Sequence, residues 1–375
     1  MLTKYRSKHC AIIFTVLLFF VHAGAARADS ISLSDYWTLR NFIEQHPAQA
    51  GLTHSFSERV VGTPAPVNVD LDRPARIAVV YPGIQASDYW RRSVSSLEAR
   101  LTALGVPHVI DTHFTRPGSE VRRQAVLIND ALRQDPDYLI FTLDAFRHRV
   151  IIERLIARGR PKVILQNVTT PLRAWRQSQP FLYVGFDHAE GTRLLIDHIL
   201  SGEDAPKKIA ILYGPRGYVS SARGDTFRSA ALSRAKTEIV ASYYVGFDRE
   251  NAREATESLL RRHPEVDFIY ACATDIALGA VDALRELDRT RDVRLNGWGG
   301  GIAELDLVAT GALEATVMRM NDDNGVAMAE AIALDLAGRG DEVPQVYSGD
   351  FALVTPDLAP EQLAALKRRA FRYSQ

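Results

Sequence analysis

From residue 76 onwards, short unbroken apolar runs alternate with longer stretches in which apolar residues recur every three or four positions. The unbroken runs predict strands buried on both faces, and the three-to-four spacing predicts amphipathic helices. This alternation is typical of a parallel sheet covered by helices. The strands predicted in the first half are 77–80, 108–110, 138–143, 163–166 and 181–186, and the helices are 89–104, 120–133, 146–157 and 189–200.

The second half of the chain opens with the same pattern as the first. The run KIAILYGP at 208–215 echoes RIAVVYPG at 76–83, and PEVDFIYACATD at 264–275 echoes PDYLIFTLD at 136–144. The two echoes lie at similar offsets, about 130 residues apart. A chain of 375 residues is long enough for two cores. The repeat therefore predicts two lobes of one design, with the ligand between them.

We expect an α/β protein with two Rossmann-like lobes, each built on a parallel sheet, joined by a hinge of several crossings. Glycine-containing joints at 184–187 (VGFD) and 296–301 (NGWGGG) are the expected crossings, and such a hinge permits closure around a ligand. The expected parts are a signal peptide at 1–28, an N-terminal arm at 29–75, an N-terminal lobe at 76–187 completed by about 298–345, and a C-terminal lobe at 188–297 completed by about 346–375.

The first residues have the composition of a secretory signal. Lys4, Arg6 and Lys8 precede an apolar segment at 11–21, and a small-x-small site ends at Ala28. We expect cleavage after Ala28 and a periplasmic protein, because the apolar segment is too short to span a bilayer. The first 28 residues hold four of the 45 Lys and Arg residues and none of the 45 Asp and Glu residues. The rest is slightly acidic, which gives no reason to expect a nucleic-acid partner.

Two further features of the chain are predicted to be structural. In the arm, Ser34 or Asp35 could cap a short helix that Pro47 ends, packed on the outside of the first lobe. Cys272 is the one cysteine left after the signal peptide, so an intramolecular disulfide is impossible. Its apolar neighbours predict a buried, inert thiol.

The turn after the first strand carries the first candidate binding residues. Gln85, Ser87 and Trp90 lie between an apolar strand and a helix, which is where open α/β sheets bind ligands. An amide, a hydroxyl and an indole suit a small polyol or sugar better than a phosphate. The alternative is that Trp90 is a core residue and the two polar side chains only complete the turn.

Sequence motifs of common enzymes are absent. We find no Gly-x-Ser-x-Gly, His-Glu-x-x-His, Cys-x-x-Cys or Gly-Lys-Ser/Thr motif, and the glycines at 299–301 lack dinucleotide-binding spacing. His188, beside Asp187, has no nucleophile in reach that we can identify, which favours a structural histidine. The sequence therefore predicts a binding protein that is not an enzyme and carries no cofactor or metal.

Several motifs resemble a known family, the ribose-type (type I, Venus-flytrap) periplasmic binding proteins. TDIALGA at 274–280 is similar to that family as a whole. A closer resemblance, covering nearly all of the chain after the signal peptide, is to its autoinducer-2-binding, LuxP-like branch. The stretches that carry it are SDYW at 87–90, LQN at 165–167, QPFLYVGFDHAEG at 179–191, RGDTF at 223–227, NGWGGG at 296–301, VMRMNDD at 317–323, YSGDF at 347–351 and KRRAFRYS at 367–374.

The resemblance implies a ligand and its contacts. The ligand of that branch is a furanosyl borate diester, a hydroxyl-rich ring carrying a tetrahedral borate anion, with boron present only as part of the ligand. The matching positions here are Gln85, Ser87, Trp90, Asn167, Arg223, Thr274, Asp275, Trp298 and Arg319. Arg223 and Arg319 would hold the borate, because planar guanidinium forks match paired oxygens. Asp275 would accept hydroxyl protons of the ring, and Trp298 would offer an indole donor or an apolar wall.

The resemblance also implies a signalling role. We expect a quorum-sensing receptor whose occupancy is relayed by the periplasmic domain of a LuxQ-like membrane hybrid sensor histidine kinase. The alternative is a sugar-binding (ribose/galactose-type) subunit of an ABC transporter. That alternative shares the fold, the compartment and the hinge, and differs in the charge of its pocket.

Overall fold

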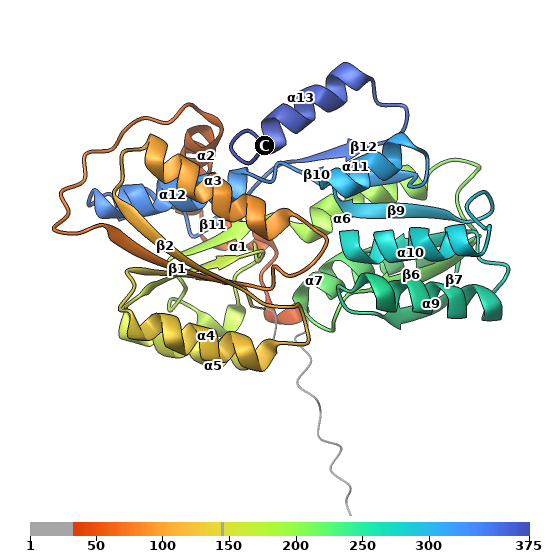
Figure 1. Ribbon diagram of the computed structural model, residues 1–375, viewed down its shortest axis with the longest axis horizontal. Helices are drawn as coiled ribbons and strands as arrows, with labels where there is room; N and C mark the ends of the chain where they lie inside the picture. The colour runs from red at the N-terminus through yellow and green to blue at the C-terminus, as the bar shows by residue number, and fades with distance from the viewer. Residues whose placement is uncertain (1–32, 144–145) are drawn as a thin grey trace, which may run out of the picture.

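The structure, a computed structural model, describes residues 33–143 and 146–375 and contains two six-stranded sheets side by side (Figure 1). The expected signal peptide at 1–28 lies outside these residues. The first sheet has the order β11-β5-β4-β3-β1-β2, and its strands are parallel. They are β1 (Ala75–Tyr81), β2 (His108–Phe114), β3 (Tyr138–Phe141), β4 (Lys162–Gln166), β5 (Leu182–Gly185) and β11 (Val346–Ser348).

The second sheet repeats this design in the order β12-β10-β9-β8-β6-β7. Its strands pair in parallel except β12, which runs antiparallel to β10. They are β6 (Lys208–Tyr213), β7 (Glu238–Tyr244), β8 (Phe268–Ala271), β9 (Arg294–Gly299), β10 (Ala315–Arg319) and β12 (Phe351–Val354). The α/β fold class with two parallel-sheet lobes, predicted from the alternating apolar runs, is confirmed.

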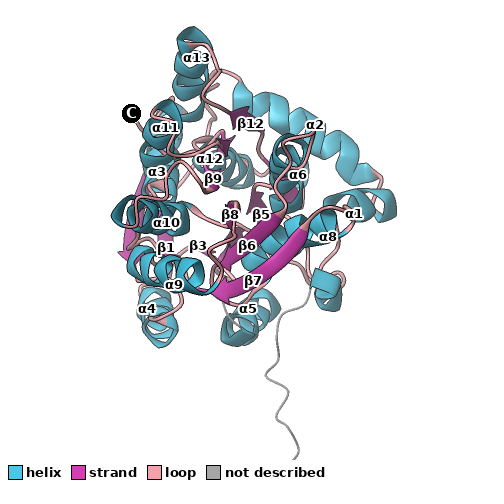
Figure 2. Cartoon of the chain, turned by 90° about the vertical axis from the view of Figure 1, so that its right-hand side faces the viewer, coloured by secondary structure: helices cyan, strands magenta, loops and turns pink. Residues whose placement is uncertain are grey.

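Helices cover the faces of both sheets. The first lobe carries α1 (Leu39–Gln45), α2 (Ala48–Val61), α3 (Tyr89–Ala103), α4 (Val121–Arg133), α5 (Phe146–Arg158) and α12 (Asp323–Leu336). The second carries α6 (His188–Ile199), α7 (Tyr218–Ser220), α8 (Thr226–Leu232), α9 (Arg249–Arg262), α10 (Thr274–Glu286), α11 (Ile302–Ala309) and α13 (Pro360–Ala370). Figure 2, which looks onto the second lobe, shows its strands between α9 and α10 on one side and α6 and α8 on the other. Among the described residues, no helix combines the length and the apolar content needed to cross a membrane.

The chain returns to the first lobe later than the sequence predicted. We expected residues 298–345 to complete the N-terminal lobe, but β9, α11 and β10 belong to the second lobe. The apolar strand β10 pairs in parallel with β9, and only after Arg319 does the chain cross back, so that α12 packs on α3 and α2. The expected completion of the C-terminal lobe from residue 346 is wrong for β11, which pairs with β5 of the first sheet.

Within residues 33–143 and 146–375, three crossings therefore join the lobes. They lie between β5 and α6, between β10 and α12, and between β11 and β12. The expected crossing at 184–187 coincides with the first of these. The expected crossing at 296–301 does not connect the lobes, because Gly297 is a buried residue within β9 and is packed against Glu304.

The described part of the N-terminal arm forms two α-helices where one helix was predicted. Thr38 caps α1 by accepting a hydrogen bond from the Asn41 N–H (3.1 Å), and α2 begins directly after Pro47. Phe56 and Val60 of α2 are fully buried in the core that α12 and α3 share. The arm thus packs on the first lobe, and α2 was missed because it buries only these two side chains.

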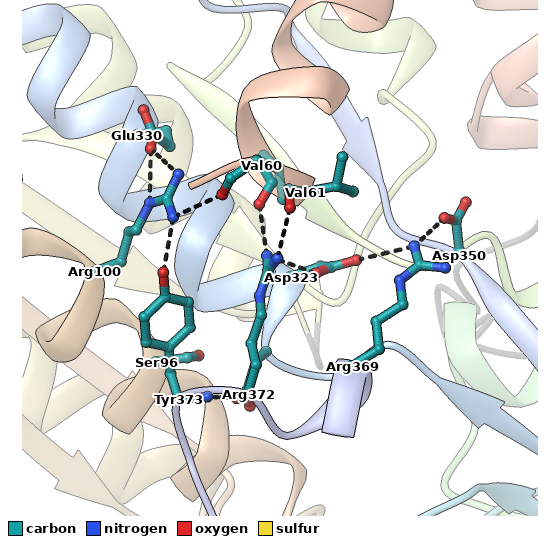
Figure 3. Close-up of polar contacts among 12 residues, drawn as sticks. Val60, Val61, Ser96, Arg100, Asp323, Glu330, Asp350, Arg369, Arg372 and Tyr373 are labelled. Atoms are coloured by element: carbon teal, nitrogen blue, oxygen red, sulfur yellow. Dashed lines mark hydrogen bonds and ion pairs between the residues drawn. The ribbon is translucent and has the colours of Figure 1, made fainter. Parts of the chain in front are cut away.

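The C-terminal residues after α13, here called the C-terminal tail (371–374), join the two lobes a further time (Figure 3). Phe371 packs in the core of the second lobe. Arg372 donates to the Val61 carbonyl of α2 (3.1 Å) and to Asp323 of α12 (3.0 Å). The Tyr373 hydroxyl accepts a hydrogen bond from Arg100 of α3 (2.8 Å). The tail therefore connects the second lobe's core to three helices of the first.

Candidate ligand-binding cleft

A small polar cavity lies between the lobes and contains about 440 Å³ of space including its mouth. Clefts between two domains are common places for small-molecule ligands to bind. Its lining residues come from both lobes and include eight of the nine residues singled out from the sequence. They are Pro82, Gln85, Ser87, Tyr89, Trp90, Asn167, Val219, Arg223, Phe247, Ala273, Thr274, Trp298 and Arg319.

The turn between β1 and α3 forms the wall of the first lobe. The strand ends at Tyr81, whose ring packs 4.6 Å from the ring of Trp90, and Gln85 donates to the Pro82 carbonyl (2.8 Å). Trp90 is only 4% exposed, so it is a core residue and a cavity-lining residue at once. Ser87 is also buried and lines the cavity. The two interpretations of this turn that the sequence left open are therefore compatible.

Asn167, at the end of β4, presents an unused acceptor. Its backbone has φ 67°, in the left-handed region that asparagine tolerates better than most residues. Its N–H donates to the Val184 carbonyl (2.8 Å), which fixes the turn. The side-chain oxygen Oδ1 is buried and has no hydrogen-bond partner among the described residues. A buried acceptor without a partner is costly, so this atom suits a donor on a ligand.

Arg223 reaches the cavity from the π-helical segment Ser221–Asp225, which follows β6 and α7. Its side chain is buried, and its Nη1 donates to the Cys272 carbonyl (2.9 Å). Its Nε and Nη2 lie 3.4 and 3.3 Å from His188 Nδ1. The guanidinium carbon lies 3.4 Å from the centre of the Trp298 ring. These contacts orient the guanidinium without neutralising it.

Arg319, the last residue of β10, approaches the same cavity. Its Nε donates to the Gly299 carbonyl (3.4 Å), and its guanidinium lies 4.0 Å from the centre of the Tyr89 ring. Among the described residues, no carboxylate lies within ion-pair distance of Arg319 or Arg223, although Glu304 and Asp88 act on Arg319 from farther away. The aromatic faces compensate each charge only in part.

Burial disfavours both charges. Desolvation lowers the pKa of Arg319, and desolvation together with the nearby Arg319 charge lowers the pKa of Arg223 to about 9. Glu304 and Asp88 favour the charged form of Arg319 but do not outweigh its desolvation. Two buried cations without an ion-pair partner are electrostatically unfavourable, and an anion between them would relieve that cost. The cleft is therefore suited to a ligand that carries negative charge.

Asp275 is the predicted site residue that does not line the cavity. Its two carboxylate oxygens accept hydrogen bonds from the backbone N–H groups of Ala86 (2.7 Å) and Ser87 (3.1 Å), which belong to the opposite lobe. Thr274, one residue earlier on α10, does line the cavity. Consecutive helical side chains point about 100° apart, which explains the difference. We name the Asp275 contact with residues 86–87 the interlobe latch.

Trp298 contributes an apolar wall. Its indole N–H donates to the Thr192 hydroxyl (3.1 Å), so this donor is already used within the second lobe. The backbone around it is held by the buried Glu304, which accepts from the N–H groups of Trp298 (3.0 Å) and Gly300 (2.7 Å). Glu304 was not predicted from the sequence.

Phe247 and His188 are further residues of the site that sequence reasoning did not assign to it. Phe247 lies in VGFD at 245–248, a copy of VGFD at 184–187. In both copies the aspartate, Asp187 or Asp248, caps the following helix. This repeat could have indicated that Phe247 lies near the cleft. His188 was predicted to be structural, and it is fully buried behind the cavity, between Asn167 and Arg223.

Cys272 is a buried free thiol whose pKa is raised by desolvation, and it contributes its carbonyl to Arg223. Within residues 33–143 and 146–375, no group of three or more His, Cys, Asp or Glu side chains could hold a metal ion.

Comparisons with known proteins agree with this architecture. Residues 77–340 match the family described as periplasmic binding protein domain. The ribose import binding protein of Salmonella typhimurium is 28% identical over 173 residues, which are 46% of this chain and 57% of that protein. This chain thus spans little more than half the length of that relative. The ribose import binding protein of Bacillus subtilis is 26% identical over 235 residues, or 62% of this chain and 73% of that protein.

Solved structures show the same fold. A solute-binding protein of an ABC transporter from Agrobacterium vitis, determined with bound D-fucose, superimposes with a TM-score of 0.69 at 17% identity. The superposition covers 77% of this chain and 99% of that one.

Proposed function

The chain belongs to the periplasmic binding protein domain family, and from that premise we propose that it binds a small, hydroxyl-rich ligand carrying negative charge between its lobes. The ligand leaves the cleft unchanged, so the protein is a receptor or carrier and not an enzyme. Family membership implies a location outside the cytoplasm. This agrees with the expectation of a signal peptide cleaved after Ala28.

One observation carries the proposal: two buried guanidinium groups, Arg223 and Arg319, line one cavity with no ion-pair partner among the described residues. A neutral sugar would leave both guanidinium groups without an ion-pair partner, and only Arg319 has carboxylates, Glu304 and Asp88, acting on it. An oxyanion would accept charge-assisted hydrogen bonds, each worth about 1.5–3 kcal/mol. The remaining polar lining suits hydroxyl groups, because Asn167 has a free acceptor and Ser87 and Thr274 offer hydroxyls.

The ligand that we propose within this class is the furanosyl borate diester form of autoinducer-2. It combines a sugar-like ring, for the amide and hydroxyl side chains of the cleft, with a tetrahedral anion for the arginines. In this proposal the closed, occupied state is recognised by the periplasmic domain of a LuxQ-like hybrid sensor kinase. The sequence motifs around Trp90, Arg223 and Arg319 support this finer assignment.

The second candidate is a sugar-binding subunit of an ABC transporter. The comparisons favour this candidate over a signalling receptor, because the matching relatives are described as ribose import binding proteins. The charge of the cleft favours the anionic ligand. The two candidates therefore differ in one measurable property, the dependence of binding on a negative charge in the ligand.

Calorimetry with simple probes tests the proposal. D-Ribose forms a borate ester through its cis-diol in the presence of boric acid, and 2-deoxyribose, which lacks that furanose diol, is the control. We expect boric acid to tighten ribose binding at least about tenfold, a difference of about 1.4 kcal/mol. The variants Arg223→Gln and Arg319→Gln should lose this gain. If the affinity for ribose changes neither with boric acid nor with substitution of the two arginines, the anionic-ligand proposal is wrong and the sugar transporter subunit is favoured.

A further inference from the structure

We propose that His188 is a positioning residue of the cleft, whose neutral imidazole orients Arg223 without cancelling its charge and ties it to the turn at Asn167. This inference rests on the proposed binding of an anionic ligand. His188 does not line the cavity, so it acts through two residues that do, the Arg223 side chain and the Asn167 backbone.

The surroundings of His188 fix its tautomer. Nε2 lies 3.2 Å from the Asn167 carbonyl oxygen, which can only accept a hydrogen bond. Nδ1 lies 3.4 and 3.3 Å from Nε and Nη2 of Arg223, which can only donate. Both contacts are satisfied by one arrangement, in which Nε2 carries the proton and Nδ1 presents its lone pair.

The imidazole is also held uncharged. It is fully buried, and its ring packs 5.6 Å from the Tyr218 ring and 5.4 Å from the Trp298 ring. The charged groups that act on it are Arg223 and Arg319, both cations. Desolvation, followed by the charge of Arg223, lowers the pKa of His188 well below its ordinary value. A protonated His188 would also lose the lone pair that Arg223 needs.

A neutral acceptor leaves the charge of Arg223 in place, whereas a carboxylate would cancel it. An aspartate or glutamate at this place would orient Arg223 equally well but would form an ion pair and neutralise the cleft. Imidazole fixes the fork geometry and leaves the full positive charge for a ligand. His188 thereby contributes to the preference for an anion although it does not contact the ligand.

His188 also joins the two walls of the cleft. It is the first residue of α6, directly after the crossing from β5, so it belongs to the hinge. Asn167 directly follows β4 of the first lobe, and Arg223 belongs to the second lobe. One side chain therefore sets the relative position of an acceptor and a cation on opposite walls.

Two substitutions of His188 distinguish the role of Nδ1 from the role of Nε2. His188→Asn places an amide oxygen near the position of Nδ1 and keeps an acceptor for Arg223. His188→Gln reaches the position of Nε2, keeps a donor for the Asn167 carbonyl, and removes that acceptor. With D-ribose and boric acid as the probe, we expect His188→Asn to bind within about threefold of the wild type and His188→Gln to bind at least about tenfold more weakly. Equal losses in both variants would overturn the inference.

A second measurement needs neither a variant nor a ligand. Nitrogen-15 NMR of the ligand-free wild type should show the His188 ring as the neutral Nε2–H tautomer at every pH between 5 and 8. A ring that titrates in this range, or carries its proton on Nδ1, would overturn the inference. If the wild type shows no borate-dependent binding, the proposed function fails, and the NMR result alone then decides whether His188 orients Arg223.

Discussion

Two arginine side chains in this cleft are buried without an ion-pair partner among the described residues. Arg223 and Arg319 are buried at 4% and 5% exposure, yet their partners are carbonyl oxygens, an imidazole and aromatic rings. Elsewhere the protein pairs buried arginine conventionally, as Arg100 with Glu330. The difference between these arginines and Arg100 indicates that the positive charge in the cleft is available to a ligand.

Removing either cleft arginine should weaken the binding of an anionic ligand. For Arg223→Ala or Arg319→Ala we expect a loss of roughly tenfold to more than a hundredfold, from one lost charge-assisted contact. Arg193→Ala is the matched control, because Arg193 is exposed on α6 and pairs with Glu190. Calorimetry with ribose and boric acid measures the effect. Unchanged affinity in both cleft variants would contradict the assignment.

A buried carboxyl group beside the tail should make stability depend on pH. Desolvation outweighs the charges of Arg372 and Arg369 and raises the pKa of Asp323 from 3.8 to about 6. The folded protein then holds this proton more tightly than the unfolded chain does. The resulting contribution to stability is full below pH 3.8 and is lost as the pH rises through about 6.

Urea unfolding at several pH values tests this contribution. Relative to Asp323→Asn, which does not titrate, the wild-type free energy of unfolding should fall by about 1–3 kcal/mol between pH 4 and pH 7. A difference between the two proteins that stays constant over this range would show that Asp323 titrates normally.

The resemblance to the ribose-type periplasmic binding proteins supplied most of the predicted cleft residues, and the convergence of strand ends in an α/β sheet accounts for some of them. Gln85, Asn167 and Thr274 each follow a strand, so their meeting follows from topology. That the Asp275 carboxylate binds the backbone of the opposite lobe could not be predicted. Whether a side chain one position along a helix faces the ligand or the opposite lobe depends on how the lobes dock.

At the scale of elements, the C-terminal tail is an additional connection between the lobes. Its polar contacts involve α2, α3 and α12 (Figure 3), and Asp322 in the second crossing accepts from the N–H groups of Tyr373 (2.7 Å) and Ser374 (3.0 Å). These contacts lie beside the hinge, so the tail is placed to limit how far the lobes separate.

Loss of the Arg372 side chain should destabilise the protein. Arg372→Ala removes the donors to α2 and leaves the buried Asp323 with Arg369 at 3.8 Å as its remaining cation among the described residues. We expect a decrease of about 1–3 kcal/mol in the free energy of unfolding at pH 7, measured with urea. Arg368→Ala, on the exposed side of α13, should change it by less than about 0.5 kcal/mol. Similar effects of both changes would contradict the role of the tail.

The pattern of elements was predictable, but their assignment to lobes was not. Helix and strand periodicity is local, so most of the predicted elements are present near their expected ranges. Membership of β10 in the second sheet depends on its pairing with β9, and an apolar strand has the same sequence pattern in either sheet. The position of the crossing after Arg319 is therefore a property of the folded chain.

At the scale of the whole molecule, the two lobes are held closed by the interlobe latch. Asp275 of α10 accepts both of its hydrogen bonds from the opposite lobe. Because Arg223 and Arg319 reside in the second lobe and Gln85, Trp90 and Asn167 in the first, the cleft is complete only in this state. A ligand that contacts both walls stabilises closure by its differential affinity for the closed state.

Breaking the latch should open the molecule. For Asp275→Ala we expect a larger radius of gyration in ligand-free protein, measured by small-angle X-ray scattering, and roughly tenfold weaker binding, because closure then costs more. Asp282→Ala is the control. It lies on the same helix but pairs with Arg249 inside the second lobe. An unchanged radius and affinity in Asp275→Ala would mean that the latch does not hold the lobes.

The most direct test of the anionic-ligand assignment is native mass spectrometry of the protein purified from cells that produce autoinducer-2, with boron measured on the released ligand. We predict one small ligand and one boron atom per protein, both lost when Arg223 and Arg319 are replaced together. A neutral sugar without boron, retained by the doubly substituted protein, would contradict it.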